Sequence, residues 1–142
     1  MIRRSEIVEL ARSWRGTPFK HQGRTPFVGL DCAGVLIAIG HHFKISEFDV
    51  SNYAHFPQPA EVRRYLGAHL IRVETRIEAA LPGRVGLFAD QDYPVHMGIF
   101  AELNGLPSLI HSSARARGVT EQNLDAELAG RLRGIYEFPG VE

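Results

Sequence analysis

The chain has 142 residues and a formal net charge of zero, so charge alone gives no reason to expect nucleic-acid binding. Its length suits one domain, and we expect residues 1–142 to form a single unit. Hydrophobic residues make up 44% of the chain, as in ordinary globular proteins. No stretch approaches the roughly 20 apolar residues of a membrane helix, so we expect no membrane insertion.

The first residues are basic but lack the continuous apolar core of a secretory signal. We therefore expect synthesis in the cytoplasm without a signal peptide. If the protein acts outside the cytoplasm, we expect another route to deliver it. The single cysteine, Cys32, excludes an internal disulfide.

Hydrophobic spacing predicts helices in the first half of the chain. One apolar stripe, at helical spacing, consists of Ile7, Leu10, Ala11 and Trp14. A loop rich in Gly, Pro and Thr follows, up to Leu30. A second helix begins at Cys32 with Asp31 as its N-cap, and a third begins at Pro59, which suits a first helical turn.

Strand patterns dominate the second half. The strand-like runs are 70–73, 85–88, 95–101, 109–112 and 134–138, with a short helical turn at 77–81. Asn104 and Gly105 form a strong signal for a two-residue hairpin loop. Helices first and strands later predict an α+β domain with an antiparallel sheet.

The predicted hairpin brings two histidines together. With Asn104 and Gly105 as the loop, His111 lies opposite Gly98. His96 is two residues from Gly98, so its side chain leaves the same face of the sheet. The two histidines are then diagonal neighbours, whereas a shift of one residue would place them on opposite faces.

Cys32 has two readings. Free cysteine is often a small buried hydrophobe. At a helix N-terminus, however, the helix dipole can lower the pKa of a thiol from about 8.5 into the range ~3.5–7.5 and prepare a nucleophile. A thiol protease also needs a base and a group that orients the base. We expect His96 to be the base and His111 the orienting group, with backbone N–H groups at the helix start holding the oxyanion.

Five segments, in the right order along the chain, resemble the NlpC-type cell-wall peptidases. Residues 14–19 (WRGTPF) resemble that family's Gly-Thr-Pro-Tyr motif, and residues 30–35 (LDCAGV) resemble its Asp-Cys-Ser-Gly-Leu nucleophile motif. Residues 81–88 (LPGRVGLF) resemble its Pro-Gly-Asp strand entry. Residues 96–100 (HMGIF) resemble its His-Val-Gly-Ile-Tyr base motif, and residues 109–112 (LIHS) resemble the segment with its third catalytic residue.

The resemblance implies a papain-like NlpC-type fold, with N-terminal helices and a nucleophile at a helix N-terminus packed on a central antiparallel β-sheet. It implies that Cys32, His96 and His111 form the catalytic triad of a cysteine peptidase. The implied substrates are peptidoglycan stem peptides, cleaved at bonds that involve D-glutamate, diaminopimelate or neighbouring D-residues.

Two segments resemble the phage- and prophage-encoded branch of that family more closely: residues 16–23 (GTPFKHQG) and residues 134–140 (GIYEFPG). This resemblance implies phage tail proteins as partners. It also implies delivery to the cell wall as part of a phage or tail-like particle.

The chain departs from the family around the expected cleft. Phe19 stands in place of the usual Tyr, so a hydroxyl that could serve the oxyanion is missing there. Tyr53 can supply a phenol to the cleft or lie in an exposed loop. His21 and Asp31 are further candidates for the cleft, because both are close to Cys32 in the sequence.

We expect no metal and no cofactor, because Cys32, His96 and His111 lack the close spacing of zinc ligands. Two alternatives to the peptidase remain. The same thioester chemistry would serve an acyltransferase or an amidase acting on another substrate. The fold can also serve without catalysis, as a module in tail assembly.

Overall fold

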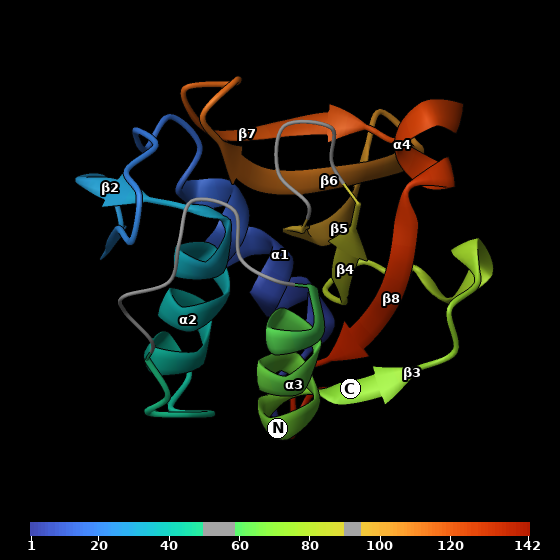
Figure 1. Ribbon diagram of the computed structural model, residues 1–142, viewed down its shortest axis with the longest axis horizontal. Helices are drawn as coiled ribbons and strands as arrows, with labels where there is room; N and C mark the ends of the chain where they lie inside the picture. Colours follow the sequence, from blue (N-terminus) through green and yellow to red (C-terminus); the bar gives the residue numbers. More distant parts are fainter. Residues whose placement is uncertain (50–58, 90–94) are drawn as a thin grey trace.

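The structure, a computed structural model, describes residues 1–49, 59–89 and 95–142. Figure 1 shows the elements in chain order: α1 (Arg4–Ser13), β1 (Arg24–Thr25), β2 (Gly29–Leu30), α2 (Cys32–His42), α3 (Pro59–His69), β3 (Ile71–Val73), the 3-10 turn η1 (Ile77–Ala79), β4 (Val85–Phe88), β5 (His96–Leu103), β6 (Leu106–Ser113), β7 (Gly118–Asn123), α4 (Ala126–Gly130) and β8 (Leu132–Glu137). The predicted α+β class is confirmed.

The main sheet has six strands in the order β3-β8-β4-β5-β6-β7, and every neighbouring pair is antiparallel. The hairpin of β5 and β6 has the predicted register, since Ile99 pairs with Ile110 and Leu103 with Leu106. Asn104 and Gly105 both adopt positive φ, 56° and 78°, as a tight hairpin loop requires.

Both faces of this sheet are buried. On one face α1, α2 and α3 gather over the strands (Figure 1), and alternate residues such as Ile99 and Ala101 point into the core beneath them. Phe100 points the other way, into a smaller core with Phe88 and Ile135. Leu128 of α4 packs against this second core. Among the helices on the first face, α2 places Cys32, the candidate nucleophile, close to the sheet.

Four elements were absent from the sequence prediction. β1 and β2 form a two-stranded sheet inside the predicted Gly-rich loop. β7, at the sheet edge, has the sequence GVTEQN, which lacks the apolar alternation that reveals a half-buried strand. Helix α4 has only five residues, too few for a periodic pattern.

Candidate active site

Cys32 occupies the first helical position of α2, and Asp31 is the N-cap as predicted. The Oδ1 atom of Asp31 accepts a hydrogen bond from the backbone N–H of Gly34 at 2.7 Å. Its Oδ2 atom accepts from the N–H of Gln22 at 2.8 Å, and Arg24 lies 3.2 Å from Oδ1. Asp31 is 4% exposed, so this buried carboxylate fixes the start of α2 against the preceding loop.

Gly34 allows that loop to approach the helix. A Cβ atom at Gly34 would lie 2.0 Å from the carbonyl oxygen of Gly23, a distance that no side chain can adopt. The first turn of α2 therefore packs directly on the backbone of this loop. The loop before Cys32 and the helix after it together fix the position of Cys32.

The two hairpin histidines are hydrogen bonded, which confirms the predicted arrangement. The Nε2 atom of His96 lies 2.5 Å from Nδ1 of His111, and the residues are 3% and 7% exposed. Gly98 makes room for this contact, because a Cβ atom there would lie 3.0 Å from Cβ of His111. A side chain at this position would push the histidines apart.

Gln122 of β7 extends the pair into a chain of three residues, and the sequence analysis missed it. Its Oε1 atom lies 3.0 Å from Nε2 of His111. Because an amide oxygen only accepts, Nε2 of His111 carries the proton and Nδ1 accepts from Nε2 of His96. Neutral His96 then has no proton on Nδ1, the atom that a base uses to accept one. Only the pairing of β7 with β6 could have pointed to Gln122, and the sequence analysis did not predict β7.

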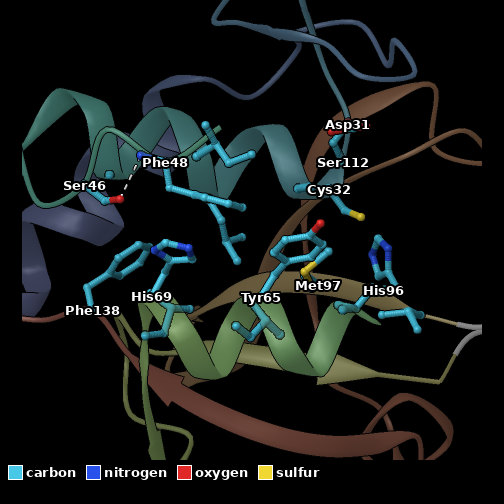
Figure 2. Close-up of a pocket in the computed structure, with 18 of the residues that line it drawn as sticks. Asp31, Cys32, Ser46, Phe48, Tyr65, His69, His96, Met97, Ser112 and Phe138 are labelled. Carbon is cyan, nitrogen blue, oxygen red and sulfur yellow. Dashed lines mark hydrogen bonds between the residues drawn. The ribbon is translucent and has the colours of Figure 1, made fainter. Parts of the chain in front are cut away.

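The thiol of Cys32 faces the His96 region of β5. Figure 2 shows the sulfur pointing toward the imidazole of His96, with Met97 beside them. The backbone N–H of Met97 is among the donors that reach the sulfur, together with those of Ala33 and Cys32 itself. Helix α2 and strand β5 thus bring the predicted nucleophile and base to one place.

The resting thiol differs from the sequence-based expectation. Burial, and to a lesser extent the negative charge of Asp31, raise the pKa of Cys32 to about 12, against the opposing effect of the backbone N–H donors. The predicted lowering of the thiol pKa by the helix N-terminus is therefore wrong. The loss of hydration on burial and the charge of the neighbouring carboxylate together raise the thiol pKa more than the helix dipole lowers it. The thiol carries its proton at neutral pH, so it needs a base to become a nucleophile.

A cavity of about 140 Å³ opens beside Cys32, and most of the surface that it exposes is apolar. Phe19, His21, Asp31, Cys32 and His96 all line it, so the structure brings these five predicted residues together. Tyr53 lies outside the described residues. His111 reaches the site through His96.

Helix α3 supplies the opposite wall of this apolar cavity. His69 of this helix lines the cavity and stacks on Phe48 with ring centroids 3.9 Å apart. Figure 2 places Tyr65 between this stacked pair and Cys32.

A second, polar cleft of about 270 Å³ begins on the other side of the histidines. His96, His111 and Gln122 line it together with charged residues of the last third of the chain, namely Arg115, Asp125, Glu127 and Arg131. His96 therefore borders an apolar cavity and a polar cleft at once.

Within residues 1–49, 59–89 and 95–142, three or more His, Cys, Asp or Glu side chains nowhere gather as metal ligands would. Over the same ranges no helix has both the length and the apolar character to span a membrane.

No protein-family model matches the chain, and no curated protein sequence matches it either. Solved structures do match. NlpC1 and NlpC2 from Trichomonas vaginalis superpose with TM-scores of 0.70 and 0.69 at 21% and 19% identity. Each match covers 95% of this chain but only 44% and 46% of the Trichomonas proteins, so the chain spans less than half of their length.

A third match is the NlpC/p60 domain of the peptidoglycan hydrolase SagA, with a TM-score of 0.60 and 18% identity. It covers 95% of this chain and 98% of that domain. The chain therefore has the α+β fold of NlpC/P60 domains, as the sequence motifs predicted.

Proposed function

We propose that this chain is a cysteine peptidase that hydrolyses peptide bonds of cell-wall peptides through a thioester on Cys32. The observation that carries the proposal is the hydrogen-bonded chain from Gln122 through His111 to His96, which borders the cavity that holds the thiol. The match to a peptidoglycan hydrolase domain supports the cell wall as the source of substrate.

In the first step His96 acts as a general base. Since the thiol of Cys32 keeps its proton at rest, Nδ1 of His96 accepts that proton as sulfur attacks the amide carbonyl. His111 orients the imidazole and stabilises the imidazolium that forms. Backbone N–H groups at the start of α2, which have no partner within the helix, are donors for the oxyanion.

In the second step the carbon–nitrogen bond breaks and His96 returns the proton to the leaving amine. Water then attacks the thioester, with His96 again as base, and restores the thiol. The polar cleft beyond His96 and His111 suits the charged peptide that leaves, because it presents both arginine and carboxylate side chains.

Digestion of purified muropeptides tests this proposal. The wild-type protein should release new amines and shorten the peptides, while Cys32→Ala and His96→Gln should each lose at least a hundredfold in rate. His42→Gln is a matched control, because His42 is exposed at the end of α2 and should keep wild-type activity. An unchanged muropeptide profile with every variant would overturn the assignment.

We further propose that the protein works in a phage or tail-like particle. The resemblance of residues 16–23 and 134–140 to phage-encoded members supports this placement. Tail-component genes next to its own gene are expected. A neighbourhood without such genes would count against this role but leave the peptidase chemistry untouched.

A further inference from the structure

The apolar surface of the cavity beside Cys32 can accept a second kind of substrate besides a stem peptide. Wall peptides carry carboxylates and amines, and burying such groups without partners is costly. The cavity instead presents aliphatic and aromatic side chains from α2, α3 and the segments around them, including Leu36, Ile45, Val62, Leu66 and Phe138. Its charged residues do not change this character, since the carboxylate of Asp31 is already satisfied at the helix cap and Glu61 is exposed.

The cavity runs along α2 away from the thiol. Cys32, Leu36 and Gly40 line it at successive turns, so it follows the helix for about 12 Å from the nucleophile. At Gly40 it still has free space, because an added Cβ atom would meet nothing closer than Ser46 at 3.9 Å. A volume of about 140 Å³ holds about five water-sized groups.

Beyond its action on wall peptides, we propose a further activity: this cavity binds a long aliphatic acyl chain, so that the same thiol also cleaves substrates with an apolar acyl half and a polar leaving half. The inference rests on the thiol chemistry proposed above. The carbonyl of such a substrate lies at Cys32, its chain lies between α2 and α3, and its polar leaving group lies in the cleft past His96.

The reaction follows the same balanced steps. Sulfur of Cys32 bonds to the acyl carbon, the bond from that carbon to the leaving nitrogen or oxygen breaks, and His96 passes the thiol proton to the leaving group. Attack by water then releases a fatty acid and restores the thiol. An acyl-accepting amine in place of water would give acyl transfer.

A series of nitrophenyl esters with acetyl, butyryl, octanoyl and dodecanoyl chains tests the acyl site. Each buried methylene contributes up to about fourfold in kcat/KM. We expect kcat/KM to rise at least tenfold from butyryl to octanoyl, and Cys32→Ala to abolish turnover of every ester.

Gly40→Leu fills the far end of the cavity and provides the sharpest comparison. It should lower kcat/KM for the dodecanoyl ester at least tenfold more than kcat/KM for the acetyl ester. Gly67→Leu is the matched control, since Gly67 lies in α3 with nothing within 4 Å and does not line the cavity. Equal thermal midpoints would show that both variants fold.

The outcomes separate this inference from the proposed function. If acetyl and dodecanoyl esters react equally well and Gly40→Leu changes neither, the acyl site is wrong while the thiol chemistry stands. Calorimetric titration of Cys32→Ala with dodecanoate then examines the cavity without turnover. Binding that Gly40→Leu abolishes would support the acyl site even if no ester were cleaved; absence of binding would overturn it.

Discussion

At the scale of single residues, the protonated thiol of Cys32 determines how the site must work. Because burial and Asp31 raise its pKa to about 12, deprotonation is unfavourable at neutral pH, and the proposed chemistry needs His96 as a base. A thiol that is protonated at rest needs a general base to remove its proton. A resting thiolate paired with an imidazolium would not need one.

Alkylation of Cys32 by iodoacetamide reports this state directly. The rate should keep rising with pH beyond the ordinary thiol pKa of about 8.5, since the thiolate fraction keeps growing up to about pH 12. The measurement is the pH–rate profile, with a small thiol as reference. A plateau near neutral pH would show a preformed thiolate and contradict the raised pKa.

Gln122 is a positioning residue for His111. Gln122→Ala removes the acceptor at 3.0 Å and frees the ring to rotate, so we expect kcat to fall roughly tenfold with little change in KM. Gln122→Glu keeps an acceptor oxygen and should recover most of that loss. Full kcat in Gln122→Ala, with an unchanged pH profile, would show that the contact is only structural.

At the scale of elements, the hairpin of β5 and β6 does most to assemble the site. Gly98 permits its close packing, because a Cβ atom there would lie 2.7 Å from Leu109 and 3.0 Å from Cβ of His111. Gly98→Ala should cost about 1–3 kcal/mol of unfolding free energy and reduce activity by displacing His111.

Urea unfolding and peptide hydrolysis measure both effects of Gly98→Ala. Gly130→Ala is the matched control, because nothing lies within 4 Å of Gly130 and α4 gains a better helix former. Wild-type stability and activity in Gly98→Ala would show that His111 needs no such clearance.

A partly buried ion pair joins the first helix to the sheet edge. Arg12 of α1 contacts both oxygens of Glu121 on β7 at 2.8 Å, and the Glu121 side chain is 1% exposed. The hydrogen bond from Arg12, aided by Ser108, lowers the pKa of Glu121 against the effect of burial. Arg12→Ala leaves this carboxylate buried and should cost about 2 kcal/mol at neutral pH.

The sign of the pH dependence follows from that lowered pKa. The stabilisation is complete above the ordinary glutamate pKa of about 4.3 and disappears as acid protonates Glu121. Chemical denaturation of the wild-type protein and Arg12→Ala should therefore converge in acid. A constant gap between them down to low pH would contradict the role of the pair.

Sequence patterns could predict the elements that carry a local signal. The Asn104–Gly105 loop determined the hairpin register and hence the contact of His96 with His111. Asp31 identified the start of α2. Neither Gln122 nor the apolar cavity has such a signal, because both depend on packing between elements distant in sequence. The thiol pKa was mispredicted for the same reason, since burial of Cys32 by other elements decides it.

At the scale of the whole molecule, the fold builds two environments of opposite character beside the proposed site. The helices cover one face of the sheet and leave an apolar cavity along α2, while the sheet edge with β7 and α4 borders a polar cleft. His96 lies where they meet. The proposed site thus has an apolar side for the acyl group and a polar side for the leaving group.

Rapid acid quench followed by intact-mass measurement tests the central claim, a covalent acyl group on Cys32. With excess substrate, the wild-type protein should gain the mass of the acyl group on the peptide that contains Cys32. His96→Gln should gain it far more slowly, and Cys32→Ala should gain none. Turnover without any adduct on Cys32, or an adduct that forms equally fast in His96→Gln, would contradict the account.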